Sequence, residues 1–254
     1  MRRNRGGPDF SWARSGVAGA VREVILSGLL GPIIGLYTRR RVVGREHLDG
    51  LEAPVLFVAN HSSHMDTPTI LLALPRAWRR RTAVAAAADY FYRVPWIARA
   101  VSLAFNTVPV QRKGEGVVPG AASHLVRLID EGWSLLVFAE GTRSRDGTVG
   151  RLRSGAAVLA AEHGLAIVPV YVSGTHAAMP PGRKWMHREP GRFAGGRHPI
   201  AIRFGPPVRP RDGEHRVEVM ERVRRFFEAS GAVTTPHERI AASSRNSASL
   251  PPAS

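Results

Sequence analysis

Two side chains of complementary chemistry lie five positions apart, directly after an apolar run. The stretch "LFVANHSSHMDTPT" (56–69) carries His61 and Asp66. On one regular helix, a spacing of five would place these side chains about 140° apart, too far to form a hydrogen bond. Pro68 favours a helix that begins near it, which leaves a turn between the two residues. Such a turn would let Asp66 orient His61 and stabilise its protonated form, which is the arrangement of a general base.

The same segment allows other interpretations of its polar residues. A carboxylate before a helix commonly accepts hydrogen bonds from the first backbone N–H groups, so Asp66 also fits a helix cap, and the two roles are compatible. His64 adds a third side chain of metal-ligand type, and a metal-dependent hydrolase is one alternative. The spacing His-x-x-His-x-Asp does not match known zinc motifs, however. We therefore expect His64 to lie at the surface or behind the site, and we expect no metal.

The sequence offers no partner nucleophile for the histidine. The chain has no cysteine, and it has no Gly-x-Ser-x-Gly motif. Ser62 and Ser63 are adjacent to His61, but neighbouring side chains rarely face one another. We therefore expect His61 to take a proton directly from a substrate hydroxyl, in a transfer without a covalent enzyme intermediate.

A second polar group follows another apolar run, in "FAEGTRSRDG" (138–147). A glycine turn after a strand exposes backbone N–H groups, and a hydroxyl and a guanidinium beside them can hold a phosphate and glycerol hydroxyls. Arg112 closes the segment "NTVPVQR" (106–112) and is a candidate for a second phosphate contact. The candidate substrate-binding residues are Arg112, Glu140, Gly141, Thr142 and Arg143.

Apolar strand-like runs alternate with helical patterns along the chain. This order predicts an α/β domain with a mostly parallel central sheet flanked by helices. Active sites in such sheets gather at the carboxyl ends of the strands, so we expect the polar groups that follow strand-like runs to converge. The expected strands include residues 54–60, 81–88, 106–112, 133–144 (a strand entering a turn), 166–174 and 200–208, and the expected helices include 68–74, 117–131, 154–164 and 215–230.

The first 45 residues are strongly basic, in a chain whose formal net charge is +16. The apolar segment "VILSGLLGPIIGLY" (24–37) contains Pro32 and is shorter than the ~20 apolar residues of a membrane-spanning helix. Its basic flanks fit a helix, kinked at Pro32, that lies in a membrane interface near lipid phosphates. An ordinary helix packed on the core is the alternative.

Four segments together resemble the sequence blocks of the glycerophospholipid acyltransferases, a family that includes the 1-acylglycerol-3-phosphate (lysophosphatidate) O-acyltransferases. "NHSSHMD" (60–66) resembles the motif Asn-His-x-x-x-x-Asp, and "VPVQR" (108–112) resembles the second block with its closing arginine. "FAEGTRS" (138–144) resembles Phe-Pro-Glu-Gly-Thr-Arg-Ser, with Ala139 in place of proline, and "IVPVYV" (167–172) resembles the fourth block. The blocks occur in the order found in the family.

The resemblance implies an O-acyltransferase without metal or cofactor. His61, oriented by Asp66, would act as general base on a glycerol hydroxyl, whose oxygen attacks the thioester of acyl-CoA or acyl carrier protein. Arg112 and residues 140–143 would bind the glycerophosphate end. The implied reaction converts 1-acylglycerol-3-phosphate to phosphatidate. The alternative is the same chemistry on another acceptor, such as a different lysophospholipid or an aminolipid.

Two segments depart from the family pattern. The segment that follows the first block and often carries a lysine reads "AAAADYF" (85–91), and Leu152-Arg153 replaces a common Phe-Lys pair. Arginine keeps the charge of lysine but not its geometry. These departures concern the identity of the acceptor more than the type of reaction.

Composition and resemblance together divide the chain into three parts. We expect a basic, amphipathic, membrane-contacting helical region over 1–40, an acyltransferase domain over 41–233 and a disordered tail over 234–254. The basic surface favours anionic partners, which include an anionic membrane and an acyl carrier protein. A nucleic-acid-binding role would explain the charge, but no nucleic-acid-binding motif is present, so we expect no nucleic acid partner. The expected location is the cytoplasmic face of a membrane, with peripheral or monotopic attachment.

Overall fold

The computed structural model describes residues 10–87, 94–110, 112–113, 116–117, 123–189 and 196–234. Strands within these residues are β1 (Thr38–Val43), β2 (Leu56–Ala59), β3 (Thr82–Ala87), β4 (Thr107–Val110), β5 (Arg112–Lys113), β6 (Gly116–Val117), β7 (Ser134–Phe138), β8 (Ile167–Ser173) and β9 (His198–Phe204). The α-helices are α1 (Gly16–Glu23), α2 (Gly31–Tyr37), α3 (Asp66–Ala73), α4 (Arg76–Arg80), α6 (Pro95–Phe105), α7 (Ser123–Asp130), α8 (Gly155–Glu162), α9 (Thr175–Ala178) and α10 (Arg216–Ala229). Shorter or wider helical segments are the 3-10 helices η1 (Ser11–Arg14) and η3 (Arg45–Leu48) and the π-helix η2 (Val24–Leu30).

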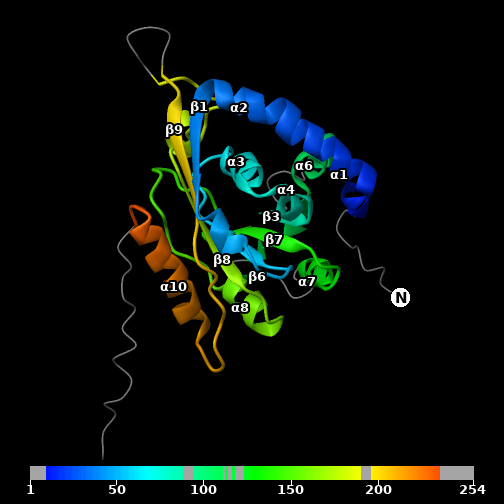
Figure 1. The fold of residues 1–254 in the computed structure, drawn as a ribbon, viewed down its shortest axis with the longest axis vertical. Coiled ribbons are helices and arrows are strands. Elements are labelled where there is room, and N and C mark those ends of the chain that lie inside the picture. The colour runs from blue at the N-terminus through cyan, green and yellow to red at the C-terminus, as the bar shows by residue number, and fades with distance from the viewer. Residues whose placement is uncertain are drawn as a thin grey trace, which may run out of the picture.

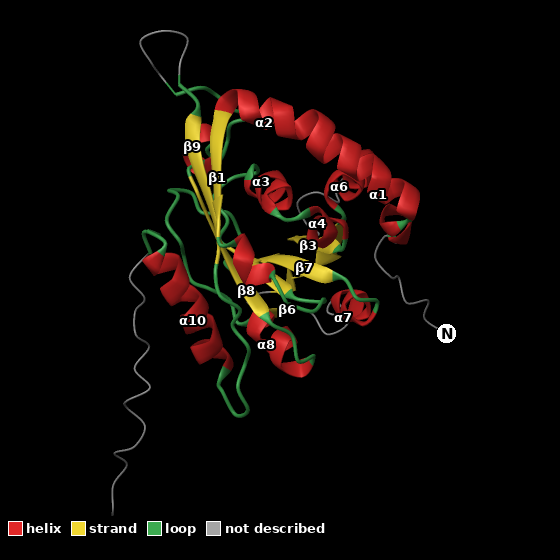
Figure 2. Ribbon diagram, viewed as in Figure 1, coloured by secondary structure: helices red, strands yellow, loops and turns green. Residues whose placement is uncertain are grey.

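In this part of the chain, seven strands form one sheet in the order β1-β9-β8-β2-β7-β3-β4, with helices on both faces (Figures 1 and 2). Strands β8, β2, β7, β3 and β4 run parallel to one another, and β1 runs parallel to β9. The β8–β9 pair is antiparallel. The predicted α/β fold with a mostly parallel central sheet is therefore confirmed.

Two apolar cores lie on opposite faces of the sheet, because side chains alternate along each strand. In β2, Leu56 and Val58 belong to the core that includes α7, α8 and α10. Phe57 and Ala59 belong to the other core, which includes α3 and part of the N-terminal helix. All four side chains are completely buried. Burial on both faces explains why this strand appears in the sequence as one continuous apolar run.

The N-terminal helix runs without interruption from Gly16 to Tyr37 along one edge of the molecule (Figure 2). The π-helical η2 precedes α2, and the N–H of Gly31 donates to the Leu26 carbonyl. Pro32 has no N–H to donate, and the wider turns that lead into it accommodate this loss within the helix. A π-helical segment thus directly precedes the helix that contains Pro32, and the expected kink stays a prediction. By length and composition alone, the helix is long and apolar enough to cross a membrane, which the short apolar run did not indicate.

Charged side chains fasten this helix to the domain. Arg22 is buried, and its Nε donates to the Leu103 carbonyl of α6 over 2.9 Å. Burial, followed by the charge of Arg14, lowers the pKa of Arg22 to about 10, so the guanidinium stays charged at neutral pH. Next to it, Glu23 forms a salt bridge with Arg79 of α4. The helix is therefore held by two other helices at neighbouring positions.

Some predicted boundaries differ from the structure, and others cannot be compared. The strand expected over 200–208 is β9, which begins at His198 and ends at Phe204. Residues 88–93 and 190–195 and the tail from 235 on lie outside the described residues. The division of the chain into three parts stays a prediction.

Gly174 makes the turn from β8 into α9. Its φ is +86°, and a Cβ at this position would lie 2.0 Å from the backbone oxygen of Pro199 in β9. Only glycine adopts this backbone conformation readily and leaves room for the neighbouring strand. The turn therefore depends on the absence of a side chain.

We expect Gly174→Ala to lower the free energy of unfolding by about 3 kcal/mol or more, because backbone strain and a steric overlap add. Urea unfolding followed by circular dichroism measures this change. Gly19→Ala is the matched control, because nothing lies within 4 Å of a Cβ built there and its helical backbone suits alanine. Equal unfolding midpoints for the two variants would contradict this account of the turn.

Candidate active site

His61 and Asp66 lie within hydrogen-bonding distance at the carboxyl end of β2. The His61 Nδ1 is 2.9 Å from Asp66 Oδ2, and the same oxygen accepts the backbone N–H groups of Ser62 (2.7 Å) and Ser63 (2.8 Å). Asp66 is fully buried, whereas the His61 side chain is 17% exposed. A carboxylate accepts hydrogen bonds and cannot donate them, so this contact places the imidazole proton on Nδ1. Nε2 is then the basic nitrogen, on the side of the ring away from Asp66.

The turn between these two residues ends at the start of α3. The helix begins at Asp66, two residues before the predicted start at Pro68. Pro68 still lies in the first helical turn, where a backbone N–H has no partner within the helix. The N–H groups of Ser62 and Ser63, which bind the carboxylate, precede the helix, so Asp66 closes the turn instead of capping α3. Its other oxygen, Oδ1, is buried without a hydrogen-bond partner among the described residues.

An aromatic ring from the neighbouring strand supports the imidazole. Phe138 is the last residue of β7 and is paired with Ala59 of β2. The rings of His61 and Phe138 are stacked, with centroids 3.9 Å apart and planes inclined by 18°. Stacking fixes the plane of the imidazole, and the contact with Asp66 fixes its rotation within that plane. The sequence did not identify Phe138, because this contact depends on the order of the strands.

Glu140 joins the ends of β2 and β7 through its carboxylate. One oxygen accepts the N–H of His61 (2.9 Å), and the other accepts the N–H of Gly150 (3.0 Å). Burial raises the pKa of Glu140, and the two backbone donors oppose this shift. The side chain is only 8% exposed. Glu140 was predicted to bind substrate, but in the structure both of its oxygens are engaged by the backbone.

The backbone of His61 is held on both sides. Its N–H donates to Glu140, as described, and its carbonyl accepts the N–H of Ser144 over 2.8 Å. Ser144 belongs to the loop that follows β7. The position of the catalytic candidate therefore depends on the loop of the adjacent strand as well as on its own turn.

The turn after β7 presents the remaining predicted residues. Gly141 has a φ of +74°, and a Cβ there would lie 2.8 Å from Arg153 Nε, so a side chain at this position would displace the arginine. Arg153 Nε donates to the Glu140 carbonyl (3.2 Å). Beyond the glycine, Thr142 is exposed and Arg143 is half-buried. Both side chains are accessible beside the His61 turn.

His64 lies close enough to Arg143 to respond to its charge. Burial is the main cause that lowers the pKa of His64 to about 4, and the positive charge of Arg143 adds to it. His64 is therefore neutral at physiological pH. It is half-buried, and among the described residues no group of three or more His, Asp or Glu side chains has the arrangement of a metal site.

Asn60 ties the end of β2 to β8 through its side-chain amide. Its Nδ2 donates to the Val172 carbonyl (2.9 Å), and its Oδ1 accepts the Val172 N–H (2.8 Å). The amide thus extends the pairing of the two strands beyond the last residue of β2. Ser63 makes a similar connection, because its hydroxyl donates to the Met179 carbonyl over 2.7 Å. These polar contacts hold the His61 turn against the segment after β8.

The strand that precedes Arg112 is separated from the strands that precede the other predicted residues. It belongs to β5, which follows β4 at the edge of the sheet, and its side chain lies outside the described residues. Strands β7 and β3 separate β4 from β2. At a strand spacing of about 4.8 Å, the end of β4 is roughly 14 Å from the end of β2. Because these strands are parallel, their carboxyl ends do lie at the same end of the sheet, as predicted.

Comparison with known proteins gives relatives of one kind. A family model described as "Acyltransferase" matches residues 39–173, more than half of the chain. The chloroplastic 1-acyl-sn-glycerol-3-phosphate acyltransferase LPAT1 of Arabidopsis thaliana is 32% identical over 143 residues, which cover 56% of this chain and 38% of the relative. A 1-acyl-sn-glycerol-3-phosphate acyltransferase of Limnanthes douglasii is 28% identical over 189 residues, covering 74% of this chain and 60% of the relative. The matches thus span less than two thirds of these relatives.

A solved structure has the same fold. The crystal structure of the 1-acyl-sn-glycerophosphate acyltransferase PlsC from Thermotoga maritima superposes with a TM-score of 0.60 at 24% sequence identity. The superposition covers 90% of this chain and 85% of that one. The family match includes the His61–Asp66 turn and the turn that follows β7. This protein therefore belongs to the acyltransferase family.

Proposed function

We propose that this protein transfers a fatty acyl group from a thioester to the free hydroxyl of a lysophospholipid, in the first place 1-acylglycerol-3-phosphate, to give phosphatidate. The observation that carries the proposal is the hydrogen bond of 2.9 Å between His61 Nδ1 and a buried Asp66. It leaves Nε2 as a base beside the turn that carries the partly exposed Arg143. The relatives described above are named as 1-acyl-sn-glycerol-3-phosphate acyltransferases, which supports this acceptor.

The chemistry follows from the orientation of the imidazole. His61 Nε2 takes the proton of the acceptor hydroxyl while the hydroxyl oxygen attacks the carbonyl carbon of the thioester. The negative charge of Asp66 stabilises the imidazolium that forms. Collapse of the tetrahedral intermediate breaks the carbon–sulfur bond, and the departing sulfur receives the proton. Every bond that forms is matched by a bond that breaks, so the reaction as proposed uses no metal, no cofactor and no acylated enzyme.

The acceptor would be held by the turn after β7. Arg143 and Thr142 are accessible there and offer a guanidinium and a hydroxyl for a phosphate. Arg112 is a further candidate for phosphate contact, and Gly141 shapes the turn. We assign Glu140 to positioning His61, because both of its oxygens bind backbone N–H groups. The thioester donor would be acyl-CoA or acyl carrier protein.

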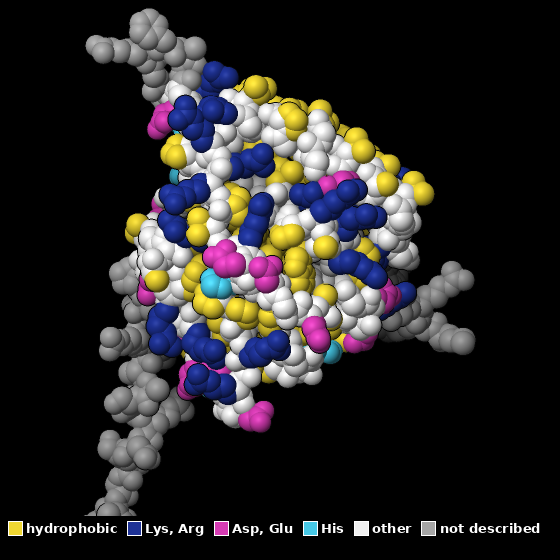
Figure 3. All heavy atoms as spheres, viewed as in Figure 1, with side chains coloured by type: hydrophobic (Ala, Val, Ile, Leu, Met, Phe, Trp, Pro, Cys, Tyr) yellow, Lys and Arg dark blue, Asp and Glu magenta, His cyan; other side chains and the backbone are white. Residues whose placement is uncertain are grey.

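The reaction would take place at an anionic membrane surface on the cytoplasmic side. Apolar side chains on the outside of the N-terminal helix are exposed, and Figure 3 shows them along the edge formed by α1 and α2. The exposed apolar residues of this helix are Val17, Val21, Val24, Leu29 and Leu36. The helix is fastened to the domain on its other side, so it presents this surface from a fixed position.

Removal of the base should abolish most of the transfer. We expect His61→Ala to reduce thiol release from acyl-CoA with 1-acylglycerol-3-phosphate by at least ~100-fold, because general-base catalysis contributes 10²–10⁴-fold. Asp66→Asn should also slow the reaction, because the imidazolium loses its counter-charge. His64→Gln is the control and should retain most activity, because His64 is neutral at the assay pH. A His61→Ala variant with the wild-type rate would exclude the proposed mechanism. If the wild-type protein releases no thiol from acyl-CoA, the comparison is repeated with acyl carrier protein as the acyl donor.

Arg143 should distinguish acceptors that carry phosphate from those that do not. We expect Arg143→Gln to raise the KM for 1-acylglycerol-3-phosphate about 10-fold with a smaller change in kcat, because a charge-assisted hydrogen bond is lost. The KM for a monoacylglycerol should not change. Arg145→Gln, on the exposed part of the same loop, is the matched control. Equal effects on both acceptors would argue for an acceptor without phosphate.

The exposed helix surface should be required for membrane binding. We expect Val24→Asp to reduce co-sedimentation with anionic vesicles about 10-fold or more, because a charge replaces a side chain that would be buried in the interface. Val217→Asp on α10 is the control, because Val217 is similarly exposed (58%, against 69% for Val24). Equal loss in both variants would show that binding depends on net charge and not on this surface.

A further inference from the structure

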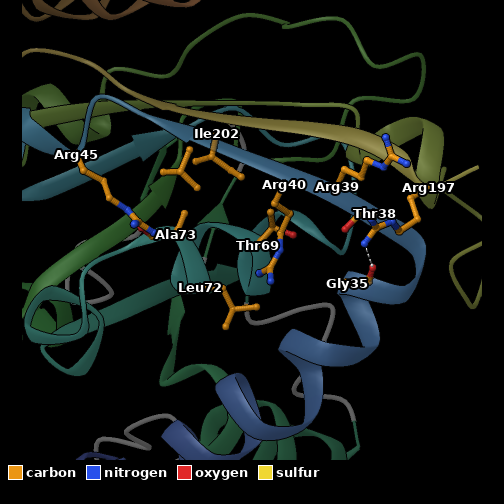
Figure 4. A pocket seen from close by; sticks show the side chains of 11 residues that line it. Gly35, Thr38, Arg39, Arg40, Arg45, Thr69, Leu72, Ala73, Arg197 and Ile202 are labelled. Carbon is orange, nitrogen blue, oxygen red and sulfur yellow. Dashed lines mark hydrogen bonds between the residues drawn. The ribbon is translucent and has the colours of Figure 1, made fainter.

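A pocket of about 460 Å³ lies beside α3, apart from the candidate active site. Its walls come from the end of α2, from β1, from one side of α3 and from β9 (Figure 4). None of the residues assigned above to the reaction or to the acceptor lines it. The pocket therefore requires its own explanation.

The pocket is strongly basic. Four arginines line it, and no aspartate or glutamate does; the arginines are Arg39, Arg40, Arg45 and Arg197. Two of them are engaged by backbone oxygens: Arg45 Nε donates to the Ala73 carbonyl (2.7 Å), and Arg197 donates to the Gly35 carbonyl (3.3 Å). A carbonyl oxygen carries no net charge, so these hydrogen bonds do not neutralise the two arginines. A pocket of this composition attracts an anion.

Arg40 is the arginine placed to bind a ligand. In Figure 4 its side chain extends from β1 toward Thr69 and Leu72 of α3. Among the described residues, Arg40 has no ion pair and no side-chain hydrogen bond. Much of the side chain remains accessible, yet burial of part of it lowers the pKa of Arg40. The Arg40 guanidinium has thus lost part of its hydration, and no acceptor among the described residues replaces the lost water.

An unsatisfied hydroxyl lies at the same place. Thr69 lines the pocket, is 0% exposed and has an Oγ1 without a hydrogen-bond partner among the described residues. A buried hydroxyl without a partner is unfavourable by itself. A donor hydroxyl and a partly desolvated guanidinium on facing elements match the oxygens of a phosphate group. The unsatisfied Thr69 hydroxyl is an observation independent of the positive charge of the pocket, and it also indicates a phosphate.

The rest of the pocket indicates that the phosphate belongs to a lipid. Apolar side chains share the walls with the arginines, among them Val42, Leu72 and Ile202. The pocket begins at the end of α2, whose Leu36 is 57% exposed as part of the apolar surface described above. Figure 3 shows basic side chains below that apolar edge. A headgroup phosphate in the pocket would thus adjoin the surface that contacts acyl chains.

We propose that this pocket binds the phosphate of a membrane phospholipid headgroup, with Arg40 as its first ligand and the buried Thr69 hydroxyl as a second donor, which becomes accessible when the Arg40 side chain shifts to meet the phosphate. The lipid is a component of the surrounding bilayer, and its site is separate from that of the acceptor. The inference does not depend on the transfer reaction, because it concerns residues outside the candidate active site.

Calorimetric titration with water-soluble dihexanoyl phosphatidylglycerol tests the proposal. Every protein carries Arg143→Gln, which weakens phosphate binding at the candidate active site. In this background we expect Arg40→Gln to weaken binding at least ~10-fold, as expected for loss of a charge-assisted hydrogen bond. The matched control is Arg41→Gln, the same charge change at the next position of β1, which does not line the pocket and should change binding less than about 2-fold.

Thr69→Val separates a binding site from general electrostatic attraction, because it preserves shape and net charge. We expect it to weaken lipid binding about 5-fold or more and to leave the thermal midpoint of the ligand-free protein unchanged or higher, since an unsatisfied hydroxyl is removed. Unchanged lipid binding in Thr69→Val, or equal losses in Arg40→Gln and Arg41→Gln, would overturn the site. Inorganic phosphate and glycerol 3-phosphate are titrated in parallel. If either binds as tightly as the lipid, the pocket is a site for a soluble phosphate and the lipid assignment is wrong.

Discussion

A single carboxylate oxygen organises the candidate active site. Asp66 Oδ2 accepts the backbone N–H groups of Ser62 and Ser63 and the imidazole Nδ1–H of His61. The first two contacts fold the chain back on itself between β2 and α3, and the third uses that fold to orient the ring. Because one oxygen makes all three contacts, the turn and the orientation of the imidazole cannot change independently. Loss of the carboxylate would affect the shape of the loop and the state of the imidazole together.

The polar side chains around this turn connect strands instead of filling a cavity. Glu140 joins the His61 backbone to Gly150, and Asn60 joins β2 to β8. The carboxyl ends of parallel strands lie together at one end of the sheet, where the last backbone groups of each strand lose their pairing partners. Side-chain oxygens and amides supply those partners here, so burial of polar groups stabilises the edge of the sheet at which the chemistry is placed. The supports of the site thus come from the segments that directly follow β2 and β7, together with β8.

Much of this arrangement could be predicted from the sequence, because several signals are local. The continuous apolar run of β2 reflects burial on both faces, and Pro68 indicated a helix start within two residues of the observed one. The contacts that depend on strand order could not be predicted. Phe138 reaches His61 only because β7 adjoins β2. The strand order also places β4, the strand before Arg112, at the edge of the sheet. A carboxylate after a strand looks the same in sequence whether it binds substrate or backbone, so the contacts of Glu140 with the N–H groups of His61 and Gly150 could not be predicted.

The attachment of the N-terminal helix has a geometrical consequence. Arg22 and Glu23 hold the helix near its beginning, and Arg197 donates to its backbone near the other end. A rod joined to a body at a single point can swing, but a rod joined at both ends cannot. The helix and the sheet therefore turn as one object. Whatever plane the outer side of the helix rests on sets the tilt of the sheet, and with it the height and direction of the His61 side chain.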